Sequence, residues 1–71
     1  MERDVPIRGE VIRLGQLLKL ARVAGDGTEA KALLATGTIR VNGEPERRRG
    51  RQLHAGDEVA AGDEKLRVVA G

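Results

Sequence analysis

The sequence of 71 residues predicts an α+β fold, in which a helical hairpin is followed by a small antiparallel sheet of three to four short strands. Two patterns predict this order. Up to residue 37, leucine and alanine recur at the spacing of amphipathic helices. Beyond it, apolar residues alternate with polar ones, and turn residues separate the runs, as in short strands. A chain of this length makes one domain, which buries roughly 60% of its unfolded surface.

The N-terminal residues 1–10 are predicted to be an extended arm, and residues 11–71 to be the folded domain. The arm has apolar alternation only at Val5 and Ile7, and Pro6 lies between them. Such a segment lacks the length for a helix and the regularity for a central strand. A short edge strand is expected immediately after the arm, at the start of the domain.

Two helices are predicted to form the hairpin. The first has apolar residues on one face, at i, i+3, i+4 and i+7: Leu14, Leu17, Leu18 and Ala21. Gly25 and Gly27 end it, and Asp26 caps the next helix, because Glu29 three residues later completes a capping box. The second helix turns Ala30, Leu33 and Leu34 inward. It ends at Gly37, since glycine readily adopts the left-handed conformation that follows a helix.

Strands are predicted from Ile39 onward, where apolar residues occupy alternate positions. Asn42-Gly43 is a strong signal for a type I′ hairpin turn. Pro45 suits an edge strand, because proline donates no backbone hydrogen bond. The returning strand is expected over residues 46–49, with Gly50 as a bulge. Two further short strands are expected near residues 58–60 and 65–69.

The charge is unevenly distributed, although the formal net charge is only +2. Ten of the 13 basic residues are arginine, and four of these form a cluster: Arg47, Arg48, Arg49 and Arg51. Acidic residues concentrate elsewhere, at positions 57–58 and 63–64. This asymmetry is typical of a protein with one basic face. Charge alone leaves open whether that face binds a nucleic acid or an acidic protein.

Candidates for catalysis are almost absent. His54 is the only histidine, and the chain has no cysteine, no tyrosine and no glycine-rich phosphate loop. The paired acidic residues lie in predicted turns, where aspartate is favoured for its local hydrogen bonds. We therefore expect no catalytic residue, no metal site and no cofactor. With no apolar run near the roughly 18 residues of a membrane span and no signal peptide, we expect a cytoplasmic protein without a membrane partner.

The order of these motifs resembles the S4-type RNA-binding domain, also called the alpha-L motif, over roughly residues 12–69. The most specific part is the stretch Gly37-Thr38-Ile39-Arg40-Val41-Asn42-Gly43 after a helical hairpin, and Gly56-Asp57 supports it. The stretches 14–19, 29–31 and 46–50 are similar to a bacterial branch of stand-alone, single-domain members of this family.

The resemblance implies a protein that binds structured RNA, such as ribosomal or transfer RNA, without catalysis. The RNA contacts of the family carry over onto Arg13, Lys31, Arg40 and Asn42, and onto Arg47, Arg48, Arg49 and Arg51, while Lys19 extends the basic surface along the first helix. Many members have Ser-Arg where this chain has Asp26-Gly27. Asp26 keeps the cap, but the arginine is missing, and the arginine cluster is the candidate to compensate for it.

The predicted elements place several of these residues. Arg40 and Asn42 are expected on the outward face of the first strand. Lys31 is expected in the first turn of the second helix, away from the apolar side chains. Arg47 and Arg49 are expected on one face of the returning strand. Together they predict a basic surface that continues from the helical hairpin onto the adjacent strands.

Two other classes of protein fit part of the pattern. One is a protein-interaction module whose basic face binds an acidic protein. The other is a β-grasp sulfur-carrier-like protein, since Val41-Asn42-Gly43-Glu44 and the C-terminal Val-Ala-Gly have counterparts there. Sulfur carriers end in Gly-Gly and begin with a hairpin, whereas this chain ends in Ala70-Gly71 and its helices come first.

Overall fold

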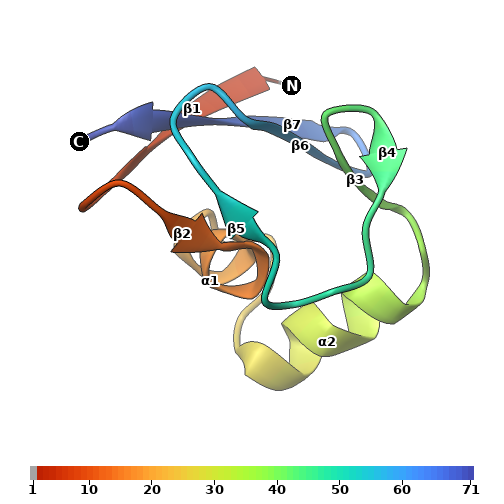
Figure 1. Cartoon of the computed structure of the whole chain (residues 1–71). Coiled ribbons are helices and arrows are strands. Elements are labelled where there is room, and N and C mark those ends of the chain that lie inside the picture. The colour runs from red at the N-terminus through yellow and green to blue at the C-terminus, as the bar shows by residue number, and fades with distance from the viewer. Residues whose placement is uncertain (1) are drawn as a thin grey trace.

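The computed structural model describes residues 2–71, which form two helices and two sheets (Figure 1). The elements in chain order are β1 (Glu2–Ile7), β2 (Ile12–Arg13), α1 (Leu14–Leu20), α2 (Gly27–Ala35), β3 (Ile39–Val41), β4 (Glu44–Pro45), β5 (Gln52–Leu53), β6 (Glu58–Ala61) and β7 (Glu64–Ala70). The larger sheet has the strand order β1-β7-β6-β3-β4, and β2 pairs with β5. The predicted α+β fold is confirmed, with more strands than the three to four expected.

Strand β1 adds a pairing that the sequence did not reveal. Residues 2–7 are extended, as expected of the N-terminal segment, but they run parallel to β7 at one edge of the larger sheet. Val5 lies opposite Val68, and both side chains are buried, as is that of Ile7. The pairing joins opposite ends of the chain, so no local pattern could have predicted the partner of this segment.

Helix α1 buries Leu14, Leu17 and Leu18, as its spacing predicted, but it ends at Leu20, before the expected glycines. Arg22 follows with φ +61°, and its N–H donates to the carbonyl of Lys19. The N–H of Val23 donates to the carbonyl of Leu18. These bonds form a helix-ending motif whose left-handed position is usually glycine. Because an arginine occupies this position here, no residue pattern marked the end of the helix.

Helix α2 begins and ends where the capping residues predicted. Asp26 accepts a 2.8 Å hydrogen bond from the backbone N–H of Glu29, which satisfies one free amide at the helix start. Ala30 and Leu34 are buried and Leu33 is partly buried. Gly37 follows the helix with φ +76°, so the chain turns there toward β3.

The core is a single cluster of aliphatic side chains between the helices and the larger sheet. Its members come from both helices, from the segment between them and from strands β1, β3, β5, β6 and β7: Val5, Ile7, Leu14, Leu17, Leu18, Ala21, Ala24, Ala30, Leu34, Ile39, Val41, Leu53, Val59, Ala61, Leu66 and Val68. Leu53 is fully buried, so β5 is held in place by its one apolar side chain. Within residues 2–71, no helix has the length and apolar character needed to cross a membrane.

The predicted strand over residues 46–49 is wrong. The hairpin turn forms as expected, with positive φ at Asn42 and Gly43, and Pro45 lies on the edge strand β4. The ladder ends at Glu46, whose N–H donates to the carbonyl of Ile39. The next two backbone N–H groups donate to the carboxylate of Glu46, and the second of them is the one that would have faced β3 in a continued strand. Residues 47–51 therefore form a loop, and Gly50 lies in a turn, not in a bulge.

Candidate functional site

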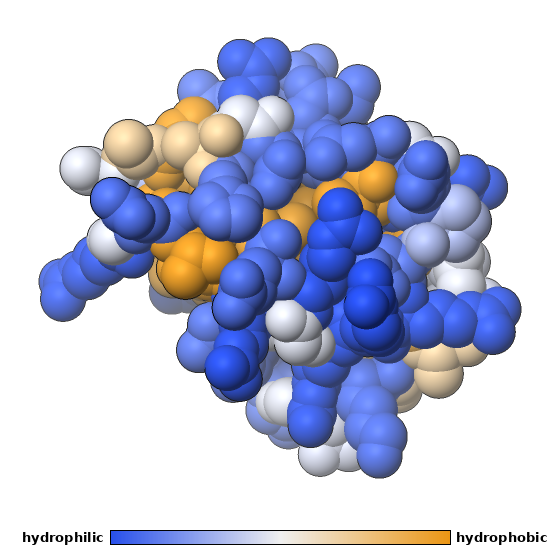
Figure 2. Space-filling model, in the orientation of Figure 1, coloured by the Kyte–Doolittle hydropathy of each residue, from blue (hydrophilic) through white to orange (hydrophobic). Residues whose placement is uncertain are grey.

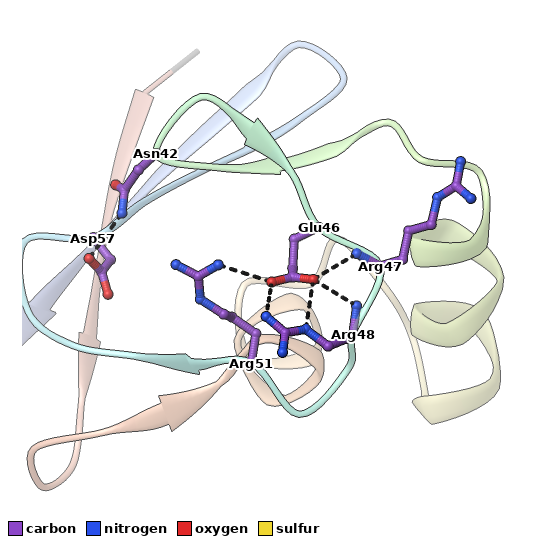
Figure 3. Close-up of polar contacts among 6 residues, drawn as sticks. All are labelled: Asn42, Glu46, Arg47, Arg48, Arg51 and Asp57. Carbon is purple, nitrogen blue, oxygen red and sulfur yellow. Dashed lines mark hydrogen bonds and ion pairs between the residues drawn. The ribbon is translucent and has the colours of Figure 1, made fainter.

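The loop of residues 46–51, which we call the arginine loop, is built around one carboxylate (Figure 3). The side chain of Glu46 is only 9% exposed. Its Oε2 accepts hydrogen bonds from the backbone N–H of Arg47 at 3.1 Å and from the backbone N–H and Nε of Arg48, each at 3.2 Å. Its Oε1 accepts from Arg48 Nη2 at 3.1 Å and from Arg51 Nη1 at 2.9 Å. A single carboxylate thus fixes three of the four arginines of the loop.

These contacts lower the pKa of Glu46 to about 2. The largest cause is the side-chain hydrogen bond with Arg48, followed by that with Arg51 and by the backbone N–H of Arg48, while burial opposes them. Hydrogen bonds to the charged form of a carboxyl group favour ionisation. Glu46 therefore remains a carboxylate, and the loop remains ion-paired, at any pH near neutrality.

The arginine loop is also tied to the start of α1 through its backbone. The N–H groups of Leu14 and Gly15 donate to the carbonyls of Arg51 at 2.8 Å and Arg49 at 2.9 Å. The first amides of a helix have no partner within the helix, so these two carbonyls cap α1. A Cβ at position 15 would lie 2.6 Å from Cγ of Arg49. Glycine at this position lets the loop pass directly over the helix.

Between the arginine loop and the two helices lies a depression of about 280 Å³, which we call the basic groove. It is lined by Arg13, Gly15, Gln16, Lys19, Gly27, Ala30, Arg49 and Gly50. Three of the predicted site residues meet here from the end of β2, from α1 and from the loop: Arg13, Lys19 and Arg49. No acidic residue is among those lining residues, so the groove has a positive potential that favours an anionic ligand.

A second depression, of about 570 Å³, lies on the other side of Gly50. Arg48 and Arg51 line it together with Gln52 and His54. The arginine loop thus separates two depressions and contributes cations to both. In Figure 2, the surface over the loop and the helical pair is mostly hydrophilic, whereas apolar residues show on the left of the view and in a narrow band across its centre.

The remaining predicted residues lie outside the basic groove. Lys31 is exposed as the fifth residue of α2, so its expected place in the first turn is wrong. Arg40 is exposed on β3, where its Nη1 donates to the carbonyl of Gly43 at 3.3 Å. Arg47 points away from the carboxylate of Glu46 (Figure 3), and its guanidinium lies against Gly37 at the end of α2. A cation there is favoured by the helix dipole.

Asn42 has a structural task. It was predicted on the outward face of the first strand, but it lies in the hairpin turn that follows this strand. Its Nδ2 donates to Asp57 at 3.2 Å (Figure 3), and its Oδ1 accepts from the backbone N–H of Glu58 at 2.9 Å. The pKa of Asp57 is lowered, first by the backbone N–H of His54 and also by this amide. The side chain of Asn42 therefore joins the β3–β4 turn to the start of β6.

The sequence did not predict the residues that shape the site. Gln16, Gly15 and Gly50 line the groove without a charge that would single them out, and their signals were nearness to Arg13 and Arg49 and a place in the stretches that carry the family resemblance. Glu46 carried one further signal, as the acidic residue immediately before the arginine cluster. Within residues 2–71, no group of three or more histidine, cysteine, aspartate or glutamate side chains could hold a metal ion.

Two comparisons with known proteins bear on this site. The family model described as the S4 domain matches residues 5–69, which include both helices, the arginine loop and the basic groove. The chain is also similar to a protein of Bacillus subtilis (strain 168) that bears the name probable ribosome maturation protein RlbA. The two are 48% identical over 59 residues, which cover 83% of each chain.

Proposed function

Because this chain belongs to the S4 domain family, we propose that it is a non-catalytic RNA-binding protein that holds structured RNA in the basic groove and along the arginine loop. One observation carries the proposal. Arg13, Lys19 and Arg49 converge on one groove that no acidic residue lines. Phosphate groups are the ligands that such a set of cations fits, since guanidinium groups donate to phosphate oxygens in pairs.

The composition of the site favours RNA that presents its phosphates in a fixed geometry. Proteins that grip single strands usually stack bases on aromatic rings, and this chain has no phenylalanine, tyrosine or tryptophan. Its groove is held rigidly, because the arginine loop is hydrogen-bonded to the start of α1. A rigid set of cations matches the backbone of a folded stem or stem–loop better than a strand that must first be ordered.

The name of the Bacillus relative suggests which RNA this is. We extend that name to this chain and propose that it binds ribosomal RNA during maturation of the ribosome, which would place it in the cytoplasm. The β-grasp alternative is not supported, because β1 and β2 pair with β7 and β5 and do not form an opening hairpin. An acidic protein as the ligand of the basic groove remains a distinct outcome of the experiment below.

Crosslinking of the protein to RNA in cells, followed by sequencing of the bound RNA, tests the proposal. We expect reads concentrated at a few structured segments of ribosomal RNA. A variant with Lys19→Gln and Arg49→Gln should lose this enrichment, because it removes two of the three groove cations. Enrichment of transfer RNA would refute the ribosomal assignment. Recovery of RNA no greater than from an uncrosslinked sample would refute RNA binding and favour the acidic-protein alternative.

A further inference from the structure

We propose that Glu46 is a positioning residue for RNA binding, whose carboxylate holds the arginine loop in the conformation that presents Arg49 to the basic groove. The inference rests on the proposed function for the identity of the ligand. It concerns a residue of the same charge as RNA phosphate, at the centre of a surface that would bind phosphate.

The placement of Glu46 is unfavourable if charge alone matters. A carboxylate within the arginine loop repels phosphate and neutralises part of the positive charge of Arg48 and Arg51. The side chain is nevertheless nearly buried and accepts five hydrogen bonds, all from residues of the loop itself. Its contacts therefore serve the conformation of the loop.

The carboxylate replaces the strand that the loop lacks. The backbone N–H groups of Arg47 and Arg48 both have Glu46 Oε2 as their acceptor. In a continued β4 only the N–H of Arg48 would have faced β3, because alternate N–H groups of an edge strand point away from its neighbour. The side chain of Arg51 is held from the far end of the loop by Oε1 of the same carboxylate. Both ends of the loop are thus bound to one carboxylate, and this restricts the conformation of the residues between them, including Arg49.

The confined loop is the one that caps α1. The carbonyls of Arg49 and Arg51 accept the N–H groups of Gly15 and Leu14, and this docking places Cγ of Arg49 against Gly15 at the wall of the groove. A loop without its central carboxylate would have to be ordered when RNA binds, and that entropy would be lost from the affinity. Preorganisation by Glu46 thus outweighs its repulsion of phosphate.

The two effects predict opposite signs for Glu46→Gln. The substitution removes one negative charge, so charge alone predicts tighter RNA binding. Positioning predicts weaker binding by about tenfold, the factor expected when charge-assisted hydrogen bonds no longer hold the bound conformation. Glu44→Gln is the matched control, because Glu44 is exposed on β4 two residues earlier and loses the same charge. We expect this control to bind as tightly as the wild-type protein or slightly more tightly.

The experiment measures binding of a labelled RNA hairpin to the whole chain by fluorescence anisotropy at constant salt. Glu46→Asp is a second variant, which keeps the charge but shortens the side chain by one methylene. We expect it to bind more weakly than wild type, because the shorter carboxylate cannot reach both ends of the loop. If folded Glu46→Gln protein binds as tightly as wild type or more tightly, or if Glu46→Asp equals wild type, the inference is overturned.

Amide hydrogen exchange without RNA separates this inference from the proposed function. The N–H groups of Leu14 and Gly15 report the docked loop, since they donate to its carbonyls. We expect faster exchange at both in Glu46→Gln and unchanged exchange in Glu44→Gln. Unchanged exchange in Glu46→Gln would overturn the positioning role, whatever the affinity. Failure of the wild-type protein to bind any RNA would overturn the proposed function, and the exchange rates would still decide whether Glu46 holds the loop.

Discussion

The basic groove makes a quantitative prediction about salt. Each phosphate contact lowers the slope of log K against log salt by roughly 0.7 to 0.9. Replacing Lys19 and Arg49 with glutamine removes two cations that line the groove. The slope should therefore become less steep by about 1.4 to 1.8, and Kd at 0.1 M salt should rise by about 25- to 60-fold on the same relation.

A matched double substitution separates this effect from a loss of net charge. Lys65 and Arg67 are also one lysine and one arginine, but they lie on β7, outside the groove, in exposed ion pairs with Glu58. Exposed ion pairs of this kind contribute roughly 0 to 1 kcal/mol to stability, so the control should stay folded. Each double variant changes the net charge from +2 to 0. The Lys65 and Arg67 variant should therefore lose only the long-range attraction between RNA and the net charge of the protein.

The assay is fluorescence anisotropy of a labelled RNA hairpin, titrated with each protein between 50 and 200 mM salt. Thermal melts followed by circular dichroism check that each variant is folded. We expect a marked change of slope for the groove variant and a small one for the β7 variant. Equal changes in the two variants would refute the reasoning, because binding would then depend on net charge and not on the groove.

Three further predictions concern single residues. Asp26→Ala removes the cap of α2 and should lower the free energy of unfolding by about 1 kcal/mol, and so the melting temperature by roughly 4 to 8 °C. An unchanged melting temperature would mean that the cap does not stabilise the fold. Lys31→Ala should leave the melt unchanged and weaken RNA binding less than Lys19→Ala, since only Lys19 lines the groove; the reverse order of affinities would place the RNA elsewhere. Because the pKa of Glu46 is lowered from 4.5 to about 2 in the folded protein, its contribution to stability is present above pH 4.5 and is lost as the pH falls toward 2. Denaturant unfolding should show this loss in the wild-type protein, and Glu46→Gln should show a smaller one.

Local patterns predicted those parts of the fold that depend on neighbouring residues. The apolar spacing of α1, the Asp26 cap and the Asn42-Gly43 turn all form as expected, because each is decided within a few residues. The strand β1 was missed because its partner is at the other end of the chain. The end of α1 was missed because Arg22 occupies a position where glycine is the usual signal.

The site was predictable in its charges but not in its shape. The arginine cluster and the basic residues at positions 13 and 19 were visible in the sequence, and the structure brings Arg13, Lys19 and Arg49 together. The strand expected over residues 46–49 would have placed the arginines on alternate faces. A loop forms instead, in which the carboxylate of Glu46 takes the backbone N–H of Arg48, the donor that a continued strand would have turned toward β3. A buried acidic residue inside a basic cluster has no local pattern that distinguishes it from a solvated one.

The central claim is that the basic groove recognises folded RNA through its phosphates. A competition titration at constant salt tests it most directly, with an RNA hairpin set against an unpaired strand of the same length and composition. We expect the hairpin to bind more tightly, with little dependence on the sequence of its stem, because the chain has no phenylalanine, tyrosine or tryptophan, and only the ring of His54, to stack on unpaired bases. Equal or tighter binding of the unpaired strand would contradict the claim and would leave only general attraction between charges.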